Sequence, residues 1–143
     1  SDTKVMEGSL DNLIDFMDQS DFGIASCKLI DGEGKFQPSA GTLPSFLPMF
    51  FWISGLDDIL GQIFTIHSYQ ERKISYYSKD REVGWVSGTA MMIRNSVIAK
   101  IGLLDEKIFM YGEDVEYCLR ANKAGFKIGL KDCFISIKNI MVF

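Results

Sequence analysis

The chain has 143 residues, of which 47% are hydrophobic and 24% charged. This composition is ordinary for a soluble globular domain that is long enough to bury a core. The net charge is −4 and no basic stripe is present, so nucleic acid is excluded as the main partner, because phosphate contacts need clustered Lys and Arg. No signal-peptide pattern is found, and the richest apolar run is too short to span a bilayer. We therefore predict one domain over residues 1–143, located in the cytoplasm or at the inner face of the membrane.

Cysteine and histidine usage argues against metal and disulfide frameworks. The chain has three cysteines, Cys27, Cys118 and Cys133, which is an odd number, and they are widely spaced. This pattern predicts buried, unpaired thiols in a reducing compartment. His67 is the single histidine, so the sequence supports neither a His-based metal site nor a Ser-His-Asp triad.

The first part of the chain predicts a helix followed by a strand. Residues 7–20 place apolar side chains at the i, i+3, i+4, i+7 spacing of an amphipathic helix, namely Leu10, Leu13, Ile14 and Met17. Residues 22–30 are rich in strand-forming residues, and residues 31–34 predict a turn.

Residues 36–81 form an irregular region. A short helix is predicted near residues 56–64 and an exposed loop over residues 67–82. The apolar run at 46–56 (FLPMFFWISGL) predicts a loop and helix that pack on the body of the domain. The alternative is a shallow, peripheral membrane contact through Phe50, Phe51 and Trp52, because exposed aromatic clusters often mark interaction surfaces.

The last part of the chain returns to regular elements, which together favour an α/β fold. The predicted elements are a strand at 90–93, a helix at 96–101 with Asn95 as its N-cap and Gly102 as its stop, a helix at 113–124 ended by Gly125, and strands at 126–130 and 133–143.

Glu113 and Asp114 stand at the start of the predicted helix 113–124. Paired carboxylates in this position can hold a metal, orient a sugar or take a proton from a hydroxyl group. The alternative is structural, because acids are favoured in the first helical turn. Upstream, Trp85 could stack on a sugar ring and Gly88 could let the backbone approach it, or the two could belong to the core and a turn. Arg120 is predicted to pair with a neighbour on its own helix, and the alternative is a contact with phosphate.

Four runs in order resemble family 2 glycosyltransferases, the inverting enzymes of GT-A fold, and among them the rhamnosyltransferase-like branch. The runs are residues 1–10 (SDTKVMEGSL), 29–39 (LIDGEGKFQPS), 85–94 (WVSGTAMMIR) and 104–120 (LDEKIFMYGEDVEYCLR). The resemblance implies a partial GT-A, or nucleotide-diphospho-sugar transferase, fold with a mixed sheet flanked by helices. The N-terminal nucleotide-binding half of that fold is expected to be absent from this chain.

The resemblance also implies roles for individual residues. Asp114 would be the general base, Glu113 would orient the acceptor, and Trp85 and Gly88 would contact substrate. Asp2 would help bind Mg²⁺ or Mn²⁺ on the diphosphate of a nucleotide-sugar donor. The expected reaction is transfer of the sugar, with inversion, to a glycan or lipid-linked acceptor in surface-polysaccharide synthesis.

Two other interpretations of the same residues stay open. One is a non-catalytic carbohydrate-binding or scaffold module, and the other is a truncated gene product without a role of its own. One departure from the family pattern bears on the choice: a histidine is usual after the strand that follows the Glu-Asp helix, and residues 133–140 contain none.

Overall fold

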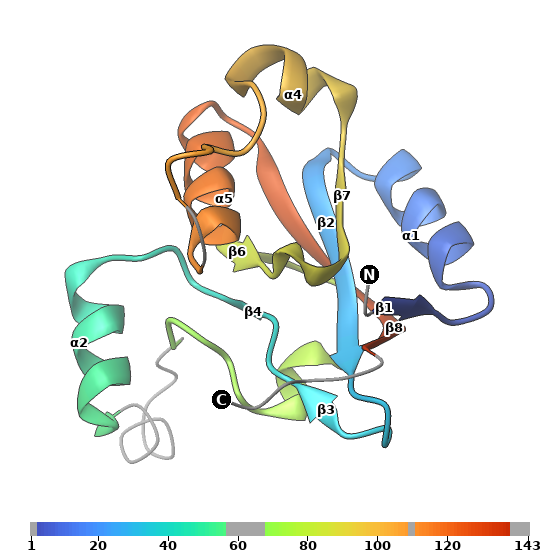
Figure 1. Ribbon diagram of the computed structural model, residues 1–143, viewed down its shortest axis with the longest axis horizontal. Helices are drawn as coiled ribbons and strands as arrows, with labels where there is room; N and C mark the ends of the chain where they lie inside the picture. The colour runs from blue at the N-terminus through green and yellow to red at the C-terminus, as the bar shows by residue number, and fades with distance from the viewer. Residues whose placement is uncertain (1–2, 57–67, 109–110, 138–143) are drawn as a thin grey trace.

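The computed structural model describes residues 3–56, 68–108 and 111–137. It is a mixed α/β fold in which a curled sheet has helices on both faces (Figure 1). Two long strands, β2 (Phe22–Ile30) and β8 (Lys127–Ile137), run parallel through its centre. The mixed sheet with flanking helices agrees with the architecture expected from the sequence.

Short strands complete the sheet on either side of this central pair, and all of them are antiparallel to the strand they join. Against β2 lie β7 (Met91–Ile93) and β3 (Phe36–Gln37); against β8 lie β5 (Arg81–Val83) and β1 (Thr3–Val5). A separate small sheet joins β4 (Ala40–Gly41) to β6 (Trp85–Val86).

The helices confirm most of the expected elements. Their bounds are α1 Ser9–Asp18, α2 Phe46–Ser54, α4 Asn95–Ile101 and α5 Glu113–Lys123, with short 3-10 helices η1 Ile74–Tyr77 and η2 Gly88–Ala90. The N-cap of α4 is Arg94, so the assignment of Asn95 to that position was wrong by one residue. Gly102 does end α4, with a φ of 78° that suits glycine.

Side chains of β2 alternate between two cores, because successive residues of a strand point to opposite faces. Ile24 belongs to the larger core, on the side of α5, whereas Ala25, Cys27 and Leu29 belong to the smaller one beneath α1. The strand is therefore buried on both faces, which agrees with its mostly apolar sequence, although the buried Ser26 and Lys28 interrupt it.

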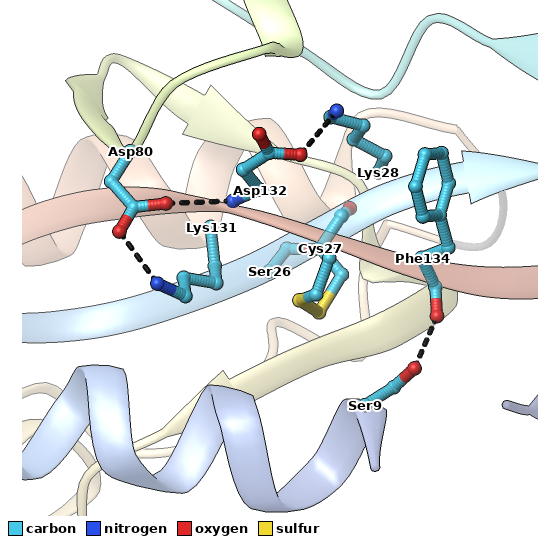
Figure 2. Close-up of a disulfide and its surroundings, with 9 residues drawn as sticks. Ser9, Ser26, Cys27, Lys28, Asp80, Lys131, Asp132 and Phe134 are labelled. Carbon is cyan, nitrogen blue, oxygen red and sulfur yellow. Dashed lines mark hydrogen bonds and ion pairs between the residues drawn. A yellow bond between two sulfur atoms is a disulfide. The ribbon is translucent and has the colours of Figure 1, made fainter. Parts of the chain in front are cut away.

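Helix α1 uses only half of its predicted apolar stripe for the core. Leu13 and Met17 are buried, whereas Leu10 and Ile14 are nearly half exposed. Leu10 instead lines an apolar groove of about 400 Å³ between α1 and β7. The N-terminal end of α1 is attached to the sheet by Ser9, whose hydroxyl donates a 2.5 Å hydrogen bond to the carbonyl of Phe134 (Figure 2).

Strand β8 differs from the two strands expected at the end of the chain. Residues 127–137 form one strand, not two strands separated near residue 132. The register between β2 and β8 slips at this point, since Cys27 pairs with Lys131 but Lys28 pairs with Phe134. Asp132 and Cys133 are the additional residues on β8, and they form a bulge in a strand that otherwise continues.

Cys27 and Cys133 form a disulfide across β2 and β8 (Figure 2). The prediction of three unpaired thiols was therefore wrong for these two residues. They are 106 residues apart in the sequence, and only the parallel pairing of their strands makes them neighbours. Cys118 is a buried free thiol, as expected.

The segment after residue 67 is not a simple exposed loop. Tyr77 is completely buried, and its hydroxyl accepts hydrogen bonds from the backbone N–H groups of Ser39 and Ala40, both at 2.9 Å. Burial raises the pKa of Tyr77 to about 12. This side chain holds the segment against β4, a long-range contact that the polar sequence gave no reason to expect. The helix predicted near 56–64 falls almost wholly on residues outside the described ranges.

Candidate active site

A cleft of about 420 Å³ opens beside the small sheet, between α2 and the start of α5. The cleft is lined by both aromatic and polar residues. The lining residues are Pro38, Trp52, Tyr69, Gln70, Trp85, Ser87, Gly88, Thr89, Tyr111, Gly112, Glu113, Asp114 and Val115. Four of the five candidate site residues from the sequence therefore meet in one place; the fifth, Asp2, lies outside the described residues.

The chain enters α5 through two consecutive residues in left-handed conformation. Tyr111 has a φ of 63° and Gly112 a φ of 94°. This conformation is uncommon for a residue with a side chain and often marks a functional turn. It turns the backbone sharply, so that Glu113 and Asp114 occupy the first turn of α5 and face the cleft edge.

Asp114 is held by two backbone groups. Its Oδ2 accepts a hydrogen bond from the N–H of Gly88 at 3.0 Å, and its Oδ1 accepts one from the N–H of Val115 at 2.7 Å. Since both oxygens are engaged, the orientation of the carboxylate is fixed. The bond to Gly88 also joins the two sequence runs that carried the family resemblance.

Glu113 lies beside Asp114 but is held differently. Its Oε2 is inaccessible to solvent and has no hydrogen-bond partner within the described residues. Buried polar atoms are normally paired, so this oxygen has unused capacity to accept a hydrogen bond from a molecule in the cleft.

Trp85 and Gly88 line the cleft and hold neighbouring segments in place. Trp85 is 6% exposed and its indole N–H donates to the carbonyl of Tyr69 at 2.8 Å, so most of the ring belongs to the core. At Gly88 a Cβ would lie 3.4 Å from Cβ of Asp114. This is an ordinary van der Waals distance, so the backbone at Gly88 packs directly against the Asp114 side chain.

Sequence reasoning did not place Trp52, Tyr69 and Tyr111 in this site. Trp52 comes from α2, and its ring meets Tyr69 edge-on with centroids 5.2 Å apart. Its Nε1 is a buried donor without a partner in the described part of the chain. Burial raises the pKa of the Tyr69 hydroxyl, and the nearby Asp114 carboxylate raises it further. Tyr111 directly precedes the Gly-Glu-Asp run and was the one of the three that its position could have indicated.

Two neighbours on α5 are structural. Burial raises the pKa of the Cys118 thiol to about 12, which leaves it a neutral, unreactive side chain beneath the site. Arg120 pairs with Glu116 at 2.7 Å and donates to the carbonyls of Ile101 and Leu103. The prediction that Arg120 pairs within its helix is confirmed, and these contacts direct it toward the end of α4.

Metal ligation was expected from Asp2 together with other groups. Within residues 3–56, 68–108 and 111–137, no group of three His, Cys, Asp or Glu side chains is arranged to hold an ion. The described residues thus do not by themselves fit a divalent cation, and no chemical step is assigned to one here. No described helix has the length and apolar character needed to cross a bilayer.

Comparison with known proteins places the chain among glycosyltransferases. No family model matches it, and no solved structure does so significantly. It is 32% identical over 124 residues to the N-acetylglucosaminyl-diphospho-decaprenol L-rhamnosyltransferase of Mycobacterium tuberculosis, a match that covers 83% of this chain and 38% of that protein.

Two further relatives support this assignment. Rhamnosyltransferase WbbL of Escherichia coli is 33% identical over 81 residues, or 57% of this chain and 30% of the relative. The low-salt glycan biosynthesis hexosyltransferase Agl10 of Haloferax volcanii is 43% identical over 49 residues, or 34% of this chain and 16% of the relative. Over this part of its relatives, the chain is homologous to rhamnosyltransferases of glycosyltransferase family 2. It spans less than two fifths of the length of these curated relatives.

Proposed function

We propose that the protein containing this chain transfers a sugar from a nucleotide-sugar to a lipid-linked or glycan acceptor, with inversion, in the synthesis of a cell-surface polysaccharide. The names of two relatives, both rhamnosyltransferases, support rhamnose as the first sugar to test. Within that protein the chain would form the acceptor side of a GT-A fold, with residues 1–143 as one unit.

Asp114 is the proposed general base. An inverting transfer needs a carboxylate on the face opposite the leaving group, where it takes the proton of the acceptor hydroxyl as that oxygen attacks the anomeric carbon. The observation that carries this assignment is the hydrogen bond from Gly88 to Asp114. It fixes the carboxylate at the edge of the cleft, and proton transfer depends on such positioning.

The cleft is proposed to hold the acceptor sugar. Aromatic faces suit the apolar faces of sugar rings, and unpaired polar atoms suit their hydroxyl groups. Trp52 supplies a ring and an unpartnered N–H, and Glu113 supplies an unpartnered carboxylate oxygen.

The donor side is proposed to lie mainly in parts of the protein outside this chain, as the length of the relatives suggests. Binding of Mg²⁺ or Mn²⁺ through Asp2 stays a prediction. Such an ion, when bound, would offset the charge that develops on the departing nucleoside diphosphate.

The test measures turnover of activated rhamnose by the full-length protein, with an N-acetylglucosaminyl-diphospho-polyprenol acceptor. We expect the Asp114→Asn variant to lose at least about a hundredfold in kcat with little change in KM, because the amide keeps the shape but cannot accept the proton. The matched control is Asp11→Asn, which changes the same residue type in the first turn of helix α1, at an exposed position.

Undiminished turnover in Asp114→Asn would remove the assignment of the base. A full-length protein that binds the acceptor but releases no nucleoside diphosphate with any donor tested would instead support the carbohydrate-binding alternative.

A further inference from the structure

Helix α2 exposes an apolar surface next to the cleft. Residues 36–56 contain no charged side chain, and no residue of α2 is buried. The most exposed are Phe46 at 81%, Ile53 at 73% and Leu47 at 61%, with Met49 and Phe50 also exposed. At 100° per residue these five side chains cover an arc of roughly 160° around the helix. We call this arc the α2 apolar face.

The opposite side of the same helix reaches the proposed acceptor site. Trp52 points to the body of the protein, where it lines the cleft and contacts Tyr69. Figure 1 shows α2 at the periphery, away from the central sheet. Whatever covers the α2 apolar face therefore lies within one helix diameter of the cleft, about 10 Å.

Charge decides how this surface can associate. The chain carries a net charge of −4, and α2 contains no Lys or Arg, so attraction to anionic lipid cannot drive binding. Aromatic and aliphatic side chains on one side of a helix can nevertheless enter the boundary between headgroups and acyl chains, where they bury 5–10 Å deep in typical cases, about the depth of one side-chain layer. No helix in the described part of the chain is long and apolar enough to cross the bilayer.

We infer that the α2 apolar face docks on a lipid bilayer and places the cleft at the headgroup layer. The choice of a bilayer as the occupant rests on the proposed function, in which the acceptor is lipid-linked. The polyprenyl tail of such an acceptor lies among the acyl chains, and its sugar stands at the headgroup layer. A protein resting on α2 would meet that sugar with Trp52 and Asp114 without drawing the tail into water.

The experiment is flotation of the full-length protein with vesicles of neutral phosphatidylcholine. We expect the native protein to float with the vesicles, in 0.5 M salt as well as at low salt (about half-molar salt reduces the screening length to a few Å). The double variant Phe46→Ser/Ile53→Ser should reduce the bound fraction at least about tenfold, because two large apolar side chains leave the interface.

The matched control is Ile74→Ser/Leu103→Ser, which removes two apolar side chains that are 58% and 74% exposed and do not line the cleft. This variant should float like the native protein. Equal loss of flotation in both double variants, or no binding by the native protein, would overturn the inference. A shift from dimer to monomer in the α2 variant by sedimentation, with native flotation unchanged, would assign the face to a second copy instead.

Turnover separates this inference from the proposed function. The α2 variant should keep native kcat on a water-soluble acceptor with a short tail and lose activity on the same sugar carried by a polyprenol in vesicles. If it is active on both, the docking role is wrong while the function stands. If the native protein transfers sugar to neither acceptor, the proposed function fails, and flotation alone then decides the membrane contact.

Discussion

The backbone N–H of Gly88 donates a 3.0 Å hydrogen bond to Oδ2 of Asp114 and so joins two segments 26 residues apart. A Cβ at residue 88 would lie 3.4 Å from Cβ of Asp114, an ordinary van der Waals distance, so the two segments pack directly against each other. The hydrogen bond connects the turn after β6 with the entrance of α5 and defines the polar edge of the cleft.

Gly88→Val is expected to slow turnover by about tenfold or more, because side-chain atoms beyond Cβ would press on the Asp114 carboxylate, and a small displacement of a reacting group has a large effect on rate. The backbone at Gly88 does not have a positive φ, so the free energy of unfolding should change by less than about 1 kcal/mol. Steady-state kinetics and urea unfolding check the two expectations. Gly23→Ala is the contrasting control: its Cβ would meet Val97 at 2.8 Å, and it should destabilise the fold without lowering the kcat of the folded fraction. Native kcat in Gly88→Val would show that the position of the Asp114 carboxylate does not depend on this contact.

The disulfide between Cys27 and Cys133 should stabilise the fold by about 2–5 kcal/mol, because it closes a long loop in the unfolded chain. The separation of 106 residues places the expected value in the upper part of that range. Urea unfolding of the native protein with and without reductant measures it, and Cys27→Ala/Cys133→Ala should unfold like the reduced protein. Identical unfolding curves in oxidised and reduced protein would contradict this expectation.

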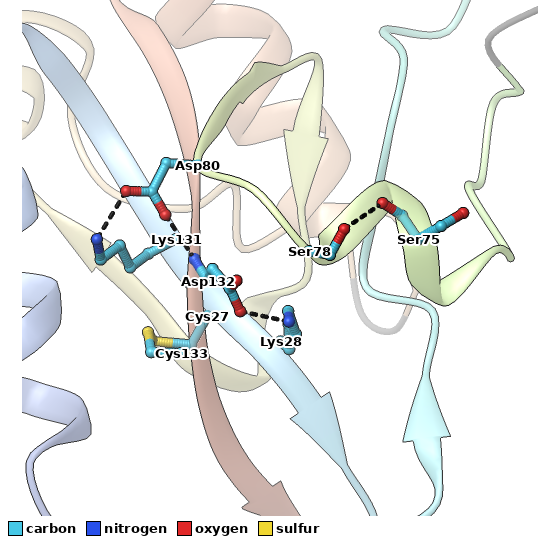
Figure 3. Close-up of polar contacts among 8 residues, drawn as sticks. All are labelled: Cys27, Lys28, Ser75, Ser78, Asp80, Lys131, Asp132 and Cys133. Carbon is cyan, nitrogen blue, oxygen red and sulfur yellow. Dashed lines mark hydrogen bonds and ion pairs between the residues drawn. A yellow bond between two sulfur atoms is a disulfide. The ribbon is translucent and has the colours of Figure 1, made fainter.

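Lys28 and Asp132 form an ion pair at the bulge between β2 and β8 (Figure 3). The lysine side chain is only 7% exposed, whereas Asp132 is 40% exposed. Asp132→Ala leaves a buried ammonium without its partner and should cost about 1–3 kcal/mol, less than for a fully buried pair because solvent reaches the aspartate.

A double-mutant cycle isolates this pair. In a Lys28→Met background Asp132→Ala should have a much smaller effect on the free energy of unfolding, since no buried charge is then left unpaired. The comparison pair is Lys127 with Asp21, which lies on the surface and should show no measurable coupling. Additive effects of Lys28→Met and Asp132→Ala would mean that the ion pair contributes nothing.

The pKa of Asp80 predicts how the free energy of unfolding changes at acid pH. Burial raises the pKa of its carboxyl, but the N–H of Asp132 and the ammonium of Lys131, at 2.8 and 2.6 Å, lower it more, so the net pKa is below its usual value (Figure 3). A carboxyl with a depressed pKa in the folded state stabilises the protein above its unfolded pKa, near 4, and loses that contribution as pH falls through the folded pKa.

Urea unfolding of native protein and Asp80→Asn between pH 2 and pH 7 tests the sign. The native protein should be the more stable at pH 7, and the difference should shrink as pH falls below about 4. A difference that stays constant down to the lowest pH would show that ionisation of Asp80 does not stabilise the fold.

Local elements were predictable from the sequence because their causes are local. The strand at 22–30 is rich in strand-forming, mostly apolar residues, and the helix from Glu113 carries acids in its first turn and glycine just after its end. The candidate carboxylates were found for the same reason, since both belong to one helix entrance. Alternation and capping act over a few residues, so their signals survive in a single sequence.

Long-range pairings were not predictable in the same way. The disulfide depends on the register of two parallel strands, and the burial of Tyr77 depends on two backbone N–H groups 37 and 38 residues earlier. Trp52 joins the cleft only because α2 turns its other side outward. The sequence by itself thus determined the elements and the residues available for chemistry. Tertiary structure decided which of them meet, because strand register and the packing of separate elements bring together residues that no local pattern connects.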